Sequence, residues 1–147
     1  MSGTIVVGVD GSPYALAALR WALDEARLRD AEIQVVHAYE TPFYLIGMGE
    51  PSPVTVSPDA VQEAAKTLLD EVVDEAVGGA VGVTIHRALA EGAPASVLRE
   101  AAEHADLLVV GTRGRGGFTG LLLGSVSSQL THHTPCPVVL VPVPKED

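Results

Sequence analysis

The strongest constraint on the fold is a regular alternation of short apolar runs with segments of helical spacing. Thr4–Asp10 reads TIVVGVD and Asp106–Gly111 reads DLLVVG, and neither run alternates cleanly between polar and apolar residues. Such runs are typical of strands that are covered on both faces in a parallel sheet. We therefore expect these two segments to be central strands.

Helix starts recur between the apolar runs. Gly11-Ser12-Pro13 supplies a turn glycine, an N-cap serine and a proline at the first helical position, and Ser57-Pro58 repeats the last two features. The spacing of apolar residues predicts helices from Pro13 to near Asp30, from Pro58 to the Gly78-Gly79 pair, from near Pro94, and over about Ser125–His133. Further strands are predicted over Ile33–Ala38, Val83–Leu89 and Val138–Val141.

This order predicts an α/β fold whose parallel strands are joined by right-handed crossovers, with helices on both faces of the sheet. The 147 residues, 47% of them hydrophobic, suffice for one core, so we expect a single domain over 1–147. Val83–Leu89 has one partly polar face, which favours a position near a sheet edge. The proline-containing segment Glu40–Val56 is expected to be a surface loop, and its role stays open.

Charge and cysteine content exclude several classes of function. The net charge of −10 offers no basic stripe, so nucleic acids and anionic membranes are not expected partners. The single Cys136 excludes an intrachain disulfide, and we expect it to be a packing residue. No apolar run approaches the roughly 18 residues that span a bilayer, so the sequence favours a cytoplasmic protein.

A ligand site is expected where the two central strands end. Open parallel sheets bind ligands beyond the carboxyl ends of their strands, at the point where the winding reverses. The segment Gly111–Ser125 reads GTRGRGGFTGLLLGS and carries six glycines between a buried strand and a helix start. Glycines bring main-chain N–H groups close to a ligand, and the helix start adds a positive dipole end. The segment therefore predicts a cradle for a diphosphate or triphosphate.

Two common phosphate-binding motifs are absent. The P-loop requires a Gly-Lys pair, which the chain lacks. The dinucleotide fingerprint fails because Thr119 occupies the position of its third glycine after Gly114-x-Gly116. Neither Gly-x-Ser-x-Gly nor His-Glu-x-x-His is present, so no catalytic set is indicated.

The pattern Gly111-x2-Gly114-x9-Gly124-Ser125 resembles the nucleotide-binding signature of the ATP-binding universal stress proteins. The segments IVVGVDGS, HAYE, VVGTRGRGG, LLLGSVSSQL and CPVVLVP, and Glu91-Gly92-x-Pro94, also follow the order of that family. The resemblance covers nearly the whole chain outside Glu40–Val56. It implies a three-layer Rossmann-like fold of the adenine nucleotide alpha hydrolase type, with a five-stranded parallel sheet in the order 3-2-1-4-5.

The resemblance also implies roles for individual residues. Asp10 would lie near the ribose and phosphates, and Ala38 and Val110 would line the adenine. The ribose and phosphates would be contacted by residues of the glycine-rich segment and the following helix: Gly111, Arg113, Gly114, Gly124, Ser125, Val126 and Ser127. A carboxylate repels bare phosphate, so Asp10 is better placed for ribose hydroxyls or for a phosphate-bound divalent cation such as Mg²⁺.

These features favour an ATP-binding module of stress response or signalling, in which the nucleotide shifts a conformational or association equilibrium. Two alternatives stay open. One is a module selective for cyclic AMP or AMP. The other is a slow ATP hydrolase, or a self-phosphorylating protein that uses Ser125 or Ser127. The family likeness also implies a homodimer through the C-terminal strand Val138–Val143, at a sheet edge.

Overall fold

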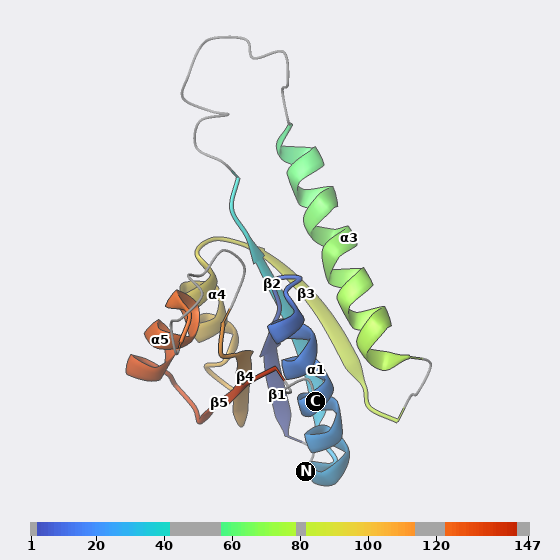
Figure 1. The fold of residues 1–147 in the computed structure, drawn as a ribbon, viewed down its shortest axis with the longest axis vertical. Coiled ribbons are helices and arrows are strands. Elements are labelled where there is room, and N and C mark those ends of the chain that lie inside the picture. Colours follow the sequence, from blue (N-terminus) through green and yellow to red (C-terminus); the bar gives the residue numbers. More distant parts are fainter. Residues whose placement is uncertain (1–2, 42–56, 79–81, 114–122, 144–147) are drawn as a thin grey trace.

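The computed structural model describes residues 3–41, 57–78, 82–113 and 123–143. Within them the chain forms one five-stranded parallel sheet flanked by helices (Figure 1). The strands are β1 (Thr4–Gly8), β2 (Glu32–Tyr39), β3 (Ile85–Glu91), β4 (Leu107–Gly111) and β5 (Val138–Val141). The helices are α1 (Pro13–Arg29), α3 (Pro58–Val77), α4 (Pro94–Ala101) and α5 (Ser125–His132).

The strand order is β3-β2-β1-β4-β5, which confirms the predicted order 3-2-1-4-5 and the central position of β1 and β4. Strand boundaries differ by at most two residues from the sequence prediction, and those of β5 are as predicted. β3 spans Ile85–Glu91 because it pairs with β2 from Ile33 opposite Ile85 to Tyr39 opposite Glu91. Its edge position confirms the prediction from its partly polar face.

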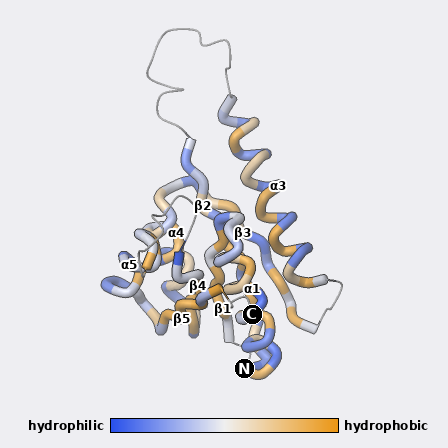
Figure 2. The backbone as a smooth tube through the Cα atoms, in the orientation of Figure 1, coloured by the Kyte–Doolittle hydropathy of each residue, from blue (hydrophilic) through white to orange (hydrophobic). Residues whose placement is uncertain are grey.

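The helices cover both faces of the sheet. α1 and α3 lie on one face, and α4 and α5 lie on the other (Figure 1). Along β1, Ile5 and Val7 belong to the core under α1 and α3, whereas Val6 belongs to the core under α4 and α5. Figure 2 shows hydrophobic and hydrophilic residues interspersed along α3, as expected for a helix with one buried face. Because both faces of β1 are buried, its sequence shows no polar alternation.

The helix ends follow local sequence signals. The Ser12 and Ser57 side chains cap α1 and α3, each accepting a hydrogen bond of 3.2 Å from the main-chain N–H three residues later. The C-cap residues of α1 and α3 are Asp30 and Gly78, both in the left-handed conformation. The N-cap residues of α4 and α5, Ala93 and Gly124, make no side-chain capping bond. No helix in the described ranges is both long and apolar enough to cross a membrane.

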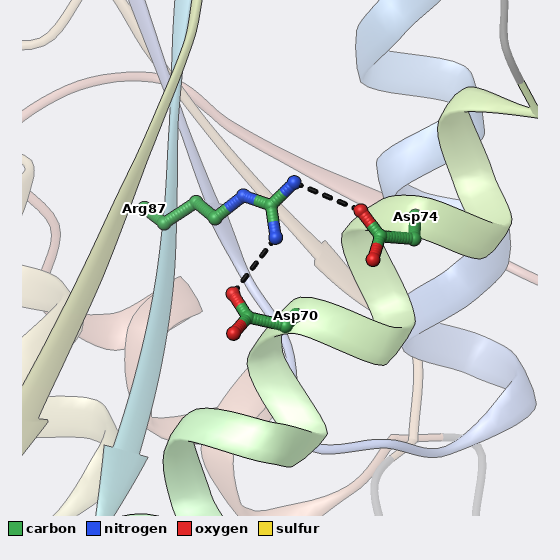
Figure 3. A network of polar contacts seen from close by, with 3 residues as sticks. All are labelled: Asp70, Asp74 and Arg87. Carbon is green, nitrogen blue, oxygen red and sulfur yellow. Dashed lines mark hydrogen bonds and ion pairs between the residues drawn. The ribbon is translucent and has the colours of Figure 1, made fainter.

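An ion-pair cluster fastens the edge strand β3 to α3. The Arg87 guanidinium donates to Asp70 at 2.7 Å and to Asp74 at 2.9 Å, one carboxylate to each terminal nitrogen (Figure 3). The two carboxylates lie one turn apart on α3, so both face the forked guanidinium group of Arg87. Two hydrogen bonds raise the pKa of Arg87, the larger effect coming from Asp70 and the smaller from Asp74.

We expect Arg87→Ala to lower the free energy of unfolding by about 1 kcal/mol at low ionic strength, because these charges are partly exposed to water. The loss should shrink in 1 M salt, where the Debye length falls to about 3 Å. Urea unfolding at the two salt concentrations measures both values. Arg27→Ala is the control, since Arg27 pairs only with the more exposed Asp24 in the described residues. If both variants lose the same free energy of unfolding, the Arg87–Asp70–Asp74 cluster contributes no more than an ordinary surface ion pair.

Candidate functional site

The carboxyl ends of β1 and β4 lie side by side at the point where the sheet changes its winding direction. The two strands pair in parallel from Ile5 opposite Leu107 to Val7 opposite Val109. From β1 the chain winds through β2 to the β3 edge, and it then returns to β4 and β5 on the other side. This is the position at which open α/β sheets bind ligands. Asp10 follows β1 there, and Gly111 ends β4.

The turn after β1 is held by its own side chains. Asp10 Oδ1 accepts a hydrogen bond of 2.9 Å from the Ser12 N–H, across Gly11, whose φ is 83°. The Ser12 hydroxyl in turn accepts from the Ala15 N–H at the start of α1. The half-buried Asp10 is therefore held by the turn that opens α1.

Gly111 allows α1 to approach the end of β4. A Cβ atom at Gly111 would lie 2.7 Å from the Tyr14 Cβ and 2.9 Å from the Tyr14 main-chain carbon and oxygen. Distances under 3.0 Å to main-chain atoms leave no room for a side chain. The glycine therefore has a packing role whether or not it also contacts a ligand.

Thr112 joins the two ends of the glycine-rich segment. Its carbonyl accepts hydrogen bonds from the Gly124 N–H at 2.7 Å and from the Ser127 hydroxyl at 2.9 Å. Its N–H donates to the Val141 carbonyl at 3.1 Å. These bonds fasten the start of α5 to the ends of β4 and β5.

The first turn of α5 faces this edge without a side-chain cap. Gly124 is the N-cap residue, with φ −75° and ψ 171°, and Ser125 behind it is exposed. The first N–H groups of a helix have no partner within the helix, and the dipole makes this end partly positive. An anion that reaches the carboxyl edge of the sheet can accept hydrogen bonds from these groups.

Three polar side chains are buried among the described residues, namely Ser12, His37 and Ser127. Each makes a hydrogen bond to the main chain beside the carboxyl edge. A buried polar group costs stability unless it is bonded, so these side chains hold the main chain at the carboxyl edge in place. No role for His37 is predicted from the sequence. The sequence signal for this role is a histidine directly after the apolar residues Val35 and Val36 of β2.

The structure brings most of the predicted site residues to one edge. Ala38 lies half-buried near the end of β2, and the Val110 side chain is buried in the core under α4 and α5. Arg113 follows Thr112 and is half-buried, and Val126 packs partly against the same core as Val110. Gly114 lies outside the described residues. Ser127 is 2% exposed, and its hydroxyl donates to the carbonyls of Thr112 and Gly124.

We expect Ser127→Ala to lower the free energy of unfolding by about 1–2 kcal/mol, because the hydroxyl is buried and bonded to the main chain. Chemical denaturation measures the loss. Ser128→Ala is the matched control on the same helix, so the gain in helix propensity is the same for both variants. Ser128 uses its carbonyl, which accepts from Thr131 and His132, and this bond survives the change. If the two variants are equally stable, the hydrogen bond from Ser127 to the Thr112 carbonyl does not stabilise the fold.

Cys136 packs partly into the core under α4 and α5, as the sequence predicted. Burial raises the pKa of its thiol, the negative charge of Asp106 adds to the rise, and a hydrogen bond with Thr134 opposes it. Only the thiolate is strongly nucleophilic, so a raised pKa lowers the reactive fraction at neutral pH.

Alkylation of Cys136 by iodoacetamide should therefore be several-fold slower at pH 7 in the folded protein than in urea. The rate should rise with pH through a midpoint above that of the unfolded chain. Mass spectrometry of the alkylated fraction over time gives both rates. A folded-state rate at pH 7 that equals or exceeds the unfolded-state rate would contradict the shielding of this thiol.

His132 and His133 are exposed, and the His132 Nδ1 bonds to the Ser128 carbonyl, one turn earlier. In residues 3–41, 57–78, 82–113 and 123–143, no group of three or more His, Cys, Asp or Glu side chains is arranged to hold a metal ion.

The fold and this edge place the chain among the doubly wound parallel α/β proteins. The model of the universal stress protein family matches residues 1–142. The chain therefore belongs to the universal stress protein family, which confirms the resemblance recognised from its motifs.

Individual relatives agree with this assignment. A universal stress protein of Thermus aquaticus is 41% identical over 147 residues, which cover 96% of this chain and 99% of the relative. A universal stress protein of Mycolicibacterium smegmatis is 36% identical over 93% of this chain but only 45% of its own length. The chain thus spans about half the length of the mycobacterial relatives it matches.

A crystal structure of a universal stress protein in complex with cAMP has the same fold. It superposes with a TM-score of 0.71 at 30% identity, and the match covers 97% of this chain and 98% of that one.

Proposed function

We propose that this chain is an adenine-nucleotide-binding module of cytoplasmic stress response or signalling, built as one domain over 1–147, with ATP as its ligand. The observation that carries the proposal is the uncapped start of α5, which lies at the carboxyl edge beside the ends of β1 and β4. The phosphates would accept hydrogen bonds from the first N–H groups of α5, at Ser125 and Val126.

The other residues at this edge fit the remainder of a nucleotide. Asp10 is held by the Ser12 N–H at the carboxyl edge of the sheet, where a carboxylate can accept from ribose hydroxyls or bind a phosphate-bound Mg²⁺ ion. Ala38 and Val110 lie near the ends of the strands on either side of β1. The half-buried Ala38 would offer an apolar side chain to the adenine, and Val110, whose side chain is buried in the core, would border the adenine with its main chain. Arg113 supplies a cation next to the phosphates.

Isothermal titration of the purified protein with ATP, in the presence and absence of Mg²⁺, tests the proposal. We expect saturable binding with one site per chain. Mass spectrometry of small molecules released from the native protein provides an independent measurement. Absence of both retained and titratable adenine nucleotide would remove the proposal and leave only the fold.

A second candidate ligand is cyclic AMP, and the relative that is bound to cAMP favours it. Cyclic AMP carries one phosphate, so it would use the first turn of α5 without engaging the whole glycine-rich segment. Competition titrations separate the candidates. Displacement of cyclic AMP by equimolar ATP supports the first, and tighter binding of cyclic AMP supports the second.

We further propose that two copies associate through β5. This strand is the edge beyond β4, and its main-chain groups on the outer side face away from the sheet. Val138, Val139 and Leu140 are only half-buried, and Val143 is 37% exposed. An apolar edge strand of this kind pairs readily with a second copy across a two-fold axis. Sedimentation that shows only monomer at micromolar concentration would rule this association out.

A further inference from the structure

His37 is a polar side chain in an apolar setting. Its neighbours on β2, Val35 and Val36, are 0% and 2% exposed, and His37 itself is 8% exposed. Among the described residues the ring makes one hydrogen bond, in which Nδ1 lies 2.8 Å from the carbonyl oxygen of Val9. A carbonyl can only accept, so Nδ1 must carry the proton whatever the charge of the ring.

This bond lies just beyond the last paired residues of β1 and β2. The register ends at Gly8 opposite Val36, and the Val9 N–H then donates to the Val36 carbonyl at 3.0 Å. The Val9 carbonyl is held by the His37 side chain instead. Because a peptide unit is planar, fixing this carbonyl also fixes the N–H of Asp10 and the direction in which the chain leaves the sheet.

We infer that His37 is a positioning residue, which acts through the Val9 peptide to place Asp10 and its turn for the ligand. This inference rests on the proposed function for its consequence in binding, but its structural part stands without a ligand. Asp10 is held by the Ser12 N–H on one side, and the preceding peptide is held by His37 on the other. Two independent bonds thus restrict the carboxylate that would meet the ribose or the cation.

The test compares three variants. His37→Leu removes the donor and keeps an apolar side chain in the site. His37→Asn keeps a donor, because its amide nitrogen is bonded to Cγ as Nδ1 is in histidine. Val73→Ala is the stability control, since Val73 is 1% exposed on α3 and its truncation leaves a cavity in the core under α1 and α3.

We expect His37→Leu to weaken nucleotide binding about tenfold, the effect of a lost buried hydrogen bond. His37→Asn should bind within about threefold of the wild type, a difference of well under 1 kcal/mol. Val73→Ala should lose stability and keep its affinity. Equal affinity of His37→Leu and Val73→Ala would overturn the inferred role in binding, even if His37→Leu is less stable.

Hydrogen exchange in the protein without nucleotide tests the structural part separately. The Ser12 N–H, which donates to Asp10 Oδ1, should exchange roughly tenfold faster in His37→Leu than in a control of equal global stability. Unchanged exchange would overturn the positioning role. If the wild-type protein binds no adenine nucleotide, the proposed function fails, and the exchange result alone decides the role of His37.

Discussion

Gly111→Ala will lower the free energy of unfolding by about 3 kcal/mol or more, the upper range for overpacking of a tight site. The added methyl group would lie 2.7 Å from the Tyr14 Cβ and 2.9 Å from Tyr14 main-chain atoms, so the start of α1 must move away from β4. A side chain can change its rotamer to relieve such a contact, but a main-chain segment fixed in a helix cannot. Urea unfolding followed by circular dichroism measures the loss.

Two other glycines supply graded controls. At Gly8 the added Cβ would lie 2.6 Å from the Leu98 Cδ1, a side-chain atom that can shift, so Gly8→Ala should cost about 1–2 kcal/mol. At Gly82 no heavy atom of the described residues, apart from its chain neighbours, lies within 4 Å of the added Cβ, and Gly82→Ala should change stability by less than about 1 kcal/mol. A Gly111→Ala variant as stable as Gly82→Ala would show that α1 does not pack against the end of β4 as closely as the structure indicates.

The sequence predicted the architecture because its strongest signals are local. The cap residues Ser12 and Ser57 start helices where they were expected, and the apolar runs of β1 and β4 form the centre of the sheet. Strand ends were less predictable, because they depend on pairing. β3 begins at Ile85 because its partner β2 begins to pair there, and the pattern of β3 itself does not encode that register.

The candidate site shows the same division. The glycine-rich segment and the switch point where β1 and β4 end follow from composition and topology. The contacts that hold them do not, because they join residues distant in the sequence. Ser127 bonds to Thr112, fifteen residues earlier, and His37 bonds to Val9, twenty-eight residues earlier. Motifs along the chain predict neither hydrogen bond. They predict a ligand contact for Ser127 and no role for His37.

Gly124 offers a test in which stability and binding should change in opposite directions. It has the φ and ψ of an ordinary N-cap residue, so an aspartate can adopt its conformation. In Gly124→Asp the new carboxylate would accept from the first N–H groups of α5. The helix should become more stable by about 1 kcal/mol.

Nucleotide affinity of Gly124→Asp should fall about a hundredfold, because the carboxylate occupies the N–H groups and also repels the phosphates, each effect being worth about 1–2 kcal/mol. Ala93→Asp is the matched control, since Ala93 is the exposed and uncapped N-cap residue of α4, the helix that follows β3 in the chain. It should gain similar stability and bind nucleotide as the wild type does. Thermal unfolding and calorimetric titration of the three proteins measure both quantities. If Gly124→Asp gains stability and still binds nucleotide at wild-type affinity, the phosphates do not lie at the start of α5, because one set of N–H groups cannot serve both acceptors.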